Sequence, residues 1–196
     1  MVILNKIKNL LILIFGKINN SRDSRSIFYH DLHSVNYFTS MSTNIDLFEK
    51  HIEVINNLGF EIVPEITKSK GQIEISFDDG FRGVYENINF LNKLQVPLTI
   101  FVITSKIGMD NYLNEMELKK LSENNLINIQ SHSHNHLNLS LLDDNQILNE
   151  LIKSKEILEQ ILQKEIFSLC FPRGFFTDNI VRIGLELKYT KQYSSI

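Results

Sequence analysis

The amino-acid sequence predicts a single α/β domain built on a largely parallel sheet with helices outside it. Two observations lead to this fold class. Short segments rich in β-branched residues alternate along the chain with segments whose apolar residues recur at helical spacing. The connections are short, and 196 residues suffice for one domain with a substantial core but not for two ordinary ones. Right-handed crossovers can close such a sheet into a barrel or leave it doubly wound.

The composition narrows the classes of partner. Hydrophobic residues make up 43% of the chain and charged residues 22%, which is typical of a globular domain. The formal net charge is −3, so the chain has no basic footprint and nucleic acid is not an expected partner. A single cysteine, Cys170, excludes a disulfide within the chain. Nothing in the composition indicates an oligomeric state.

The first residues, 1–25, are expected to lie apart from the domain, which we place at 26–196. Lys6 and Lys8 precede an apolar run at 10–15. That run is followed by no small-residue cleavage site and is far shorter than the roughly 20 residues that cross a bilayer. We therefore expect an amphipathic or surface-associated segment with peripheral membrane contact. A location in the cytoplasm or at a membrane surface is favoured over secretion.

The first elements of the domain are a strand and a helix. The stretch "SIFYH" at 26–30 is typical of a short strand and ends on a histidine. The segment 44–59 carries its apolar residues on one helical face, which predicts a helix. Thr43 or Asn44 would be its N-cap, and Gly59 would end it.

The remaining elements continue the alternation. The helix expected at 143–164 begins with Asp143 and Gln146 in capping-box spacing and carries one apolar stripe. Strands are expected at 72–77, 96–103, 126–131, 166–171 and 188–196, and further helices at 84–94, 114–124 and 178–187.

Polar motifs follow the ends of several predicted strands. They are "DDG" at 78–80, "HSHNH" at 132–136 and "PRG" at 172–174, and His30 ends the first strand. In parallel α/β folds the functional loops lie at the carboxyl ends of the strands. We therefore expect these distant motifs to meet at one rim.

The histidine cluster is compatible with a metal site or with a polar loop. His132 and His136 are four residues apart, a usual spacing for two imidazoles on one metal. Pairing His132 with His134 instead would need an extended strand. The histidine pair alone does not exclude a loop without ligands. A carboxylate at the same rim would complete a two-histidine, one-aspartate site with an open position for catalysis.

Four further residues could supply chemistry at this rim. Side chains of neighbours point in different directions, so one of Asp78 and Asp79 can face a metal while the other faces water. Alone, this Asp-Asp-Gly stretch is more simply an acidic turn. His30 could donate a proton to a leaving amine, although a buried, hydrogen-bonded histidine is the commoner role. The turn at Arg173 offers backbone N–H groups to an oxyanion.

Together, "ISFDDG" (75–80), "HSHNH" (132–136) and "CFPRG" (170–174) resemble the first three motifs of the polysaccharide deacetylases, the NodB-homology domain of carbohydrate esterase family 4. The resemblance covers about residues 26–193 and implies a distorted (β/α) barrel. No histidine follows His136, where the usual domain carries a catalytic one. The stretch "IFYHDL" is similar to the opening of a permuted subgroup that includes the poly-N-acetylglucosamine deacetylases.

The resemblance implies a role for each site residue. Asp79, His132 and His136 would bind a divalent metal, expected to be zinc. Asp78 would be the general base, and His30 would protonate the departing sugar amine. The implied activity is a metal-dependent hydrolase that removes acetyl groups from N-acetylhexosamine units of a polysaccharide, such as a bacterial cell-surface glycan.

The chain also departs from the family pattern. Cys170 stands where many members have an arginine that orients the base, so that support is absent or supplied otherwise. Arg173 stands where an aromatic residue is common, although a backbone N–H near it would still serve the oxyanion. Family members continue for about another strand after 188–196, so the domain is expected to be short at its C-terminus.

Other functions remain open from the sequence. The same fold could act as an O-acetyl polysaccharide esterase or as a catalytically silent glycan- or metal-binding domain. A magnesium-dependent phosphoryl-transfer enzyme would leave His30 and the histidine pair unexplained, and the chain has no Gly-rich phosphate loop. His134 is expected to be an exposed loop residue without a role.

Overall fold

The computed structural model describes residues 22–195 of the chain. Most of the expected segment at 1–25 therefore lies outside the described residues. The strands are β1 (Arg25–Tyr29), β2 (Asp31–His33), β3 (Ser42–Asn44), β4 (Glu61–Ile62), β5 (Gln72–Phe77), β6 (Leu98–Val102), β7 (Ile127–Ser131), β8 (Ser168–Cys170) and β9 (Lys191–Tyr193). The α-helices are α2 (Ile45–Asn57), α3 (Gly83–Glu86), α4 (Ile88–Leu94), α5 (Glu115–Ser122), α6 (Asp144–Leu162) and α7 (Asp178–Glu186).

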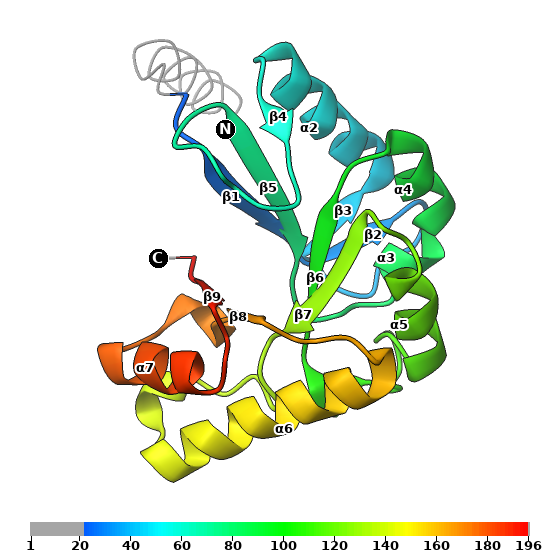
Figure 1. Cartoon of the computed structure of the whole chain (residues 1–196). Coiled ribbons are helices and arrows are strands. Elements are labelled where there is room, and N and C mark those ends of the chain that lie inside the picture. Colours follow the sequence, from blue (N-terminus) through cyan, green and yellow to red (C-terminus); the bar gives the residue numbers. More distant parts are fainter. Residues whose placement is uncertain (1–21, 196) are drawn as a thin grey trace, which may run out of the picture.

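The main sheet is parallel throughout the described residues. Its strands follow the order β1-β5-β6-β7-β8-β9, and β4 pairs with the first part of β5. The sheet curves into a half-barrel, and the helices lie around its outside (Figure 1). The predicted α/β fold of a distorted (β/α) barrel is therefore confirmed. Because the sheet curves around an open side, it is not doubly wound.

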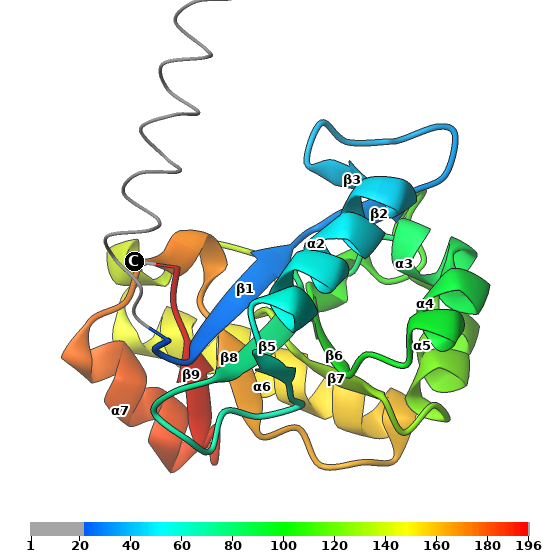
Figure 2. The same ribbon diagram turned by 90° about the horizontal axis from the view of Figure 1, so that it is seen from above.

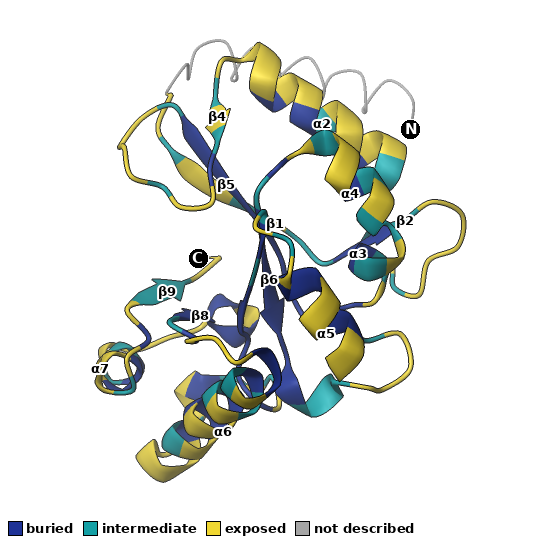
Figure 3. Ribbon diagram, turned by 45° about the vertical axis from the view of Figure 1, so that its right-hand side comes forward, coloured by how far each residue is buried: buried dark blue, intermediate teal, exposed yellow. Residues whose placement is uncertain are grey.

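The core lies between the curved sheet and its helices. Every residue of β5 and β6 is buried, as expected for parallel strands that are covered on both faces. Phe48 of α2 and Leu151 and Leu158 of α6 are fully buried against this sheet. Figure 3 shows the buried strands inside and the exposed outer faces of α2, α5 and α6. None of the helices in residues 22–195 has the length and apolar character needed to span a bilayer.

Short elements account for the differences from the predicted order. The strands β2, β3 and β4 were not predicted, since two or three residues carry no periodicity that a pattern can reveal. The pair β2–β3 lies apart from the main sheet, beside α3 (Figure 2). The helix expected at 84–94 is interrupted at Asn87, whose side-chain amide donates to the carbonyls of Leu32 and Gly83.

The start of α6 has the capping box that the sequence indicates. The Asp143 carboxylate accepts from the backbone N–H of Gln146 at 2.9 Å, and the Gln146 side chain accepts from the N–H of Asp143 at 3.0 Å. We expect Asp143→Ala to lower the free energy of unfolding by about 1 kcal/mol, because the N–H of Gln146 at the helix start loses its acceptor. Urea unfolding measures this change. Asp143→Asn keeps an acceptor of similar strength and should leave stability nearly unchanged; equal losses in both variants would contradict the capping role.

Candidate active site

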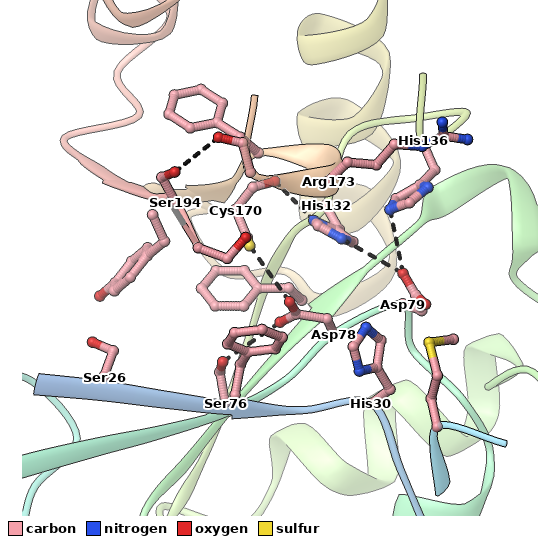
Figure 4. A pocket seen from close by; sticks show the side chains of 17 residues that line it. Ser26, His30, Ser76, Asp78, Asp79, His132, His136, Cys170, Arg173 and Ser194 are labelled. Atoms are coloured by element: carbon pink, nitrogen blue, oxygen red, sulfur yellow. Dashed lines mark hydrogen bonds and ion pairs between the residues drawn. The ribbon is translucent and has the colours of Figure 1, made fainter. Parts of the chain in front are cut away.

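Three loops at the carboxyl ends of β5, β7 and β8 meet at one pocket of about 550 Å³. The pocket is lined by all six residues that the sequence assigned to the site, and Figure 4 shows their side chains pointing toward one another, except for that of the exposed Arg173. They are His30, Asp78, Asp79, His132, His136 and Arg173. The expectation that distant motifs meet at one rim is confirmed, because the parallel order of the strands places their carboxyl ends together.

The loops reach this arrangement through an unusual backbone. Asp79, Ser133, His136 and Arg173 all have positive φ angles, between 59° and 71°, a region that residues other than glycine rarely adopt. Each such residue costs roughly 1 kcal/mol or more and persists only where surrounding contacts hold it. Local hydrogen bonds supply this support in the histidine loop, where the Ser133 hydroxyl accepts from the N–H of His136 at 3.1 Å.

Asp79, His132 and His136 form one compact group. The Oδ1 atom of Asp79 lies 3.5 Å from the Nε2 atoms of both histidines. It is buried and has no hydrogen-bond partner among the described residues. A tetrahedral zinc site with bonds of about 2.0–2.1 Å separates its ligand atoms by roughly 3.3–3.4 Å. The unpartnered oxygen and the two nitrogens therefore fit a divalent cation.

The histidines of this group are prepared to act as neutral ligands. The Nδ1–H of His132 donates to the backbone carbonyl of Cys170 at 2.8 Å, which leaves the Nε2 lone pair free for a cation. Burial, and then the nearby His136, lower the pKa of His132 to about 3. Burial likewise lowers the pKa of His136. Both rings are thus unprotonated at neutral pH, as metal ligands must be.

Asp78 lies beside this group without belonging to it. The residue is 7% exposed, and burial, followed by the neighbouring Asp79 carboxylate, raises the pKa of its side chain to about 7. Its Oδ1 atom lies 3.5 Å from the Ser76 hydroxyl, and its Oδ2 atom lies 3.7 Å from the Cys170 thiol. Asp78 therefore contacts a thiol and a hydroxyl, where the resemblance led us to expect an arginine in many family members. Burial, and then the Asp78 carboxylate, raise the pKa of Cys170, so the thiol is protonated.

The β1–β5 ladder positions His30 opposite Asp78. Tyr29 pairs with Phe77, and the N–H of Asp78 donates to the Tyr29 carbonyl at 2.8 Å. His30 and Asp78 are the next residues of the two strands, and both line the pocket. The histidine ring packs edge-on against Phe28 and is partly exposed. An imidazole and a carboxylate thus face the same space.

The C-terminal residues also form part of the pocket, which sequence analysis did not anticipate. Tyr193, Ser194 and Ser195 line it. The Tyr193 hydroxyl donates to the Glu74 carboxylate at 2.7 Å, and the Ser194 hydroxyl donates to the carbonyl of Gly174 at 2.8 Å. These contacts join β9 to β5 and to the turn after β8. No motif reveals them, because Tyr193 and Glu74 are 119 residues apart.

The prediction for His134 is wrong. This residue is 8% exposed, and its Nδ1 atom lies 2.8 Å from the hydroxyl of Thr104. Its backbone carbonyl accepts from the N–H of Ser105 at 2.9 Å. His134 therefore fastens the histidine loop to the segment after β6, and the expectation of exposure failed because the loop folds back onto a neighbouring loop.

Glu150 of α6 is a second anchor of this loop that the sequence did not suggest. Its buried carboxylate accepts from the backbone N–H of Asn135 at 2.7 Å and also from the Asn135 side-chain amide. We expect Glu150→Ala to lower the free energy of unfolding by roughly 3 kcal/mol, because two hydrogen bonds to a charged group are lost. Urea unfolding measures the loss. Glu156→Ala, an exposed change on the same helix, is the control; equal effects would contradict the anchor.

The sequence of this chain matches a known protein family. The model of the family named polysaccharide deacetylase matches residues 65–191, more than half of the chain. YxkH of Bacillus subtilis (strain 168), whose name assigns it to polysaccharide deacetylases, is 26% identical over 168 residues, covering 80% of this chain and 60% of that protein. The poly-beta-1,6-N-acetyl-D-glucosamine N-deacetylase of Staphylococcus aureus (strain MRSA252) is 27% identical over 145 residues, covering 65% of this chain and 50% of its own length.

Solved structures agree on the fold. IcaB from Ammonifex degensii superposes with a TM-score of 0.76 at 17% identity, covering 88% of this chain and 84% of that one. This chain spans 50% to 60% of the length of the two curated relatives named above. From the family match over most of the domain, the chain belongs to the polysaccharide deacetylase family.

Proposed function

We propose that this chain is a divalent-metal-dependent hydrolase that removes acetyl groups from N-acetylhexosamine units of a polysaccharide. The observation that carries the proposal is the position of Asp78 beside the Asp79, His132 and His136 group, within one pocket. The S. aureus relative, named for the N-deacetylation of poly-β-1,6-N-acetylglucosamine, supports the choice of an N-acetylated glycan.

The metal ligands follow from the donor set. Asp79, His132 and His136 would hold the cation, and two imidazoles with one carboxylate are a usual set for catalytic zinc. When bound, such a cation supplies Lewis-acid polarisation of a carbonyl and of a water molecule. The hydrogen bond from His132 to the carbonyl of Cys170 would keep the ligand ring in place.

The neighbouring residues would move the protons. Asp78 would accept a proton from the attacking water, since its carboxylate faces the pocket and lies next to the metal ligand. A cation near Asp79 would also favour the ionised form of Asp78 by offsetting the repulsion between the two carboxylates. His30 would donate a proton to the amide nitrogen as the C–N bond breaks. A backbone N–H near Arg173 would stabilise the oxyanion.

The test is acetate release by the zinc-loaded chain. We expect acetate from N-acetylglucosamine oligosaccharides, its loss after chelation, and its return when zinc is added. Release only from an O-acetylated polysaccharide would replace the proposal with an esterase. Bound zinc without acetate release from either substrate would indicate a catalytically silent binding domain.

His30→Ala should separate the proposed acid from a residue that only lines the pocket. An amide nitrogen cannot depart without a proton, whereas the phenolate of an aryl acetate can. We therefore expect acetate release from the N-acetyl oligosaccharide to fall about 10²-fold or more, and hydrolysis of the aryl ester to change much less. Steady-state rates with the two substrates provide the measurement. Equal losses on both would argue against a role as proton donor.

A further inference from the structure

A second group of potential ligands lies beside the Asp79 group. The ligand atoms of Asp78, His132 and Cys170 are all within 4.8 Å of one another. The three residues are buried, with 7%, 3% and 9% of their surfaces exposed. All three nevertheless line the pocket, so a small cation can reach them. Figure 4 shows the Cys170 sulfur directed toward Asp78, with His132 between this pair and Asp79.

The donor types of this group differ from those of the first one. A carboxylate, an imidazole and a thiolate form a three-ligand set that suits a four-coordinate cation with one open position. Thiolate ligands select soft cations over hard ones such as magnesium or manganese. We propose that Asp78, His132 and Cys170 form a second metal group that captures a thiophilic cation, for which cadmium is the diagnostic probe.

The two groups cannot both be filled independently, because each one needs His132. A cation held by Cys170 would take this ligand from the Asp79 group and would occupy the Asp78 carboxylate as well. Binding forms a sulfur–metal bond and releases the thiol proton to solvent, with no change of oxidation state. The expected inhibition of acetate release rests on the proposed function, whereas the binding itself does not.

The chain offers an unusually clear readout for this group. Cys170 is its only cysteine, so any sulfur-to-metal charge-transfer absorption must arise there. We expect the metal-free protein to develop such an ultraviolet band on titration with cadmium chloride and to saturate at one cadmium per chain. Cys170→Ser should bind cadmium without the band. Absence of the band in the unaltered protein would overturn the proposal.

Two matched variants distinguish a built group from a lone thiol. His136→Ala removes a ligand of the other group only and should retain the band. Asp78→Asn should weaken the cadmium affinity that the band reports by about 10-fold or more, since even the loss of an outer contact to a ligand costs this much. An unchanged affinity in Asp78→Asn would show that a lone thiol binds the ion and would overturn the proposal.

The titration contains no substrate, so its result is independent of the deacetylase assignment. A protein without acetate release that still shows the band would support the metal group and count against the proposed function. Acetate release by a protein that shows no band would support the proposed function and count against the metal group. Circular dichroism of Cys170→Ser, compared with the unaltered chain, verifies that loss of the band reflects the missing sulfur rather than unfolding.

Discussion

Asp78→Asn is expected to lower kcat for acetate release by about 10²–10⁴-fold, the range that general bases contribute. The amide has nearly the shape of the carboxylate but cannot accept a proton from water. Bound zinc should remain at one ion per chain, because Asp79, His132 and His136 are unchanged. Acetate assays and elemental analysis of the same sample measure both quantities.

The control for this variant is Asp110→Asn, which changes an exposed aspartate that does not line the pocket. It should leave kcat and the zinc content at the values of the unaltered protein. If Asp78→Asn retained more than a tenth of the original rate, another group would have to act as the base. Loss of zinc together with activity would instead place Asp78 among the ligands.

His136→Ala is expected to abolish both zinc retention and acetate release. The variant keeps only two of the three proposed ligands. Mutating a residue that merely hydrogen-bonds to a metal ligand already lowers metal affinity by about 10–100-fold, so losing a ligand itself should cost more. The side chain of His136 is 27% exposed, so its truncation should leave the fold intact. Zinc content after dialysis, acetate release and the thermal midpoint together provide the measurement.

A histidine outside the pocket provides the comparison. His51 of α2 contacts the Tyr29 hydroxyl at 3.0 Å and does not line the pocket. His51→Ala should keep zinc and most of the activity. Full zinc retention by His136→Ala would exclude the assigned ligand group and would leave the paired 3.5 Å separations around Asp79 without a metal-based explanation.

Much of the candidate site could be predicted because strand ends carry it. Asp78 and Asp79 follow β5 directly, and His132 follows β7, so recognising the strands was enough to place these side chains on one rim. The strands themselves were readily recognised, since buried parallel strands appear as continuous apolar runs. The helix starts at Asn44 and Asp143 were equally accessible, because capping is local in sequence.

The rest depends on contacts between distant residues. His134 is buried where its ring contacts the Thr104 hydroxyl, 30 residues earlier in the chain. Glu150, which holds the histidine loop, lies on a helix whose other face is solvated. The position of Tyr193 in the pocket lining depends on how far the sheet curves, and no local sequence pattern determines that curvature. The contact of Cys170 with Asp78 likewise required the three-dimensional arrangement, because comparison with the family pattern showed only that the common arginine is absent at this position.

The pairing of β1 with β5 has a consequence for folding fidelity. A slip of two residues along β5 would preserve which side chains face inward, since strands alternate with a period of two. Such a misaligned chain could retain its secondary structure and most of its core. It would nevertheless displace His30 by roughly 6.6 Å relative to Asp78, two strand rises of about 3.3 Å. Folded but inactive molecules are therefore the expected product of an error at the Tyr29–Phe77 rung.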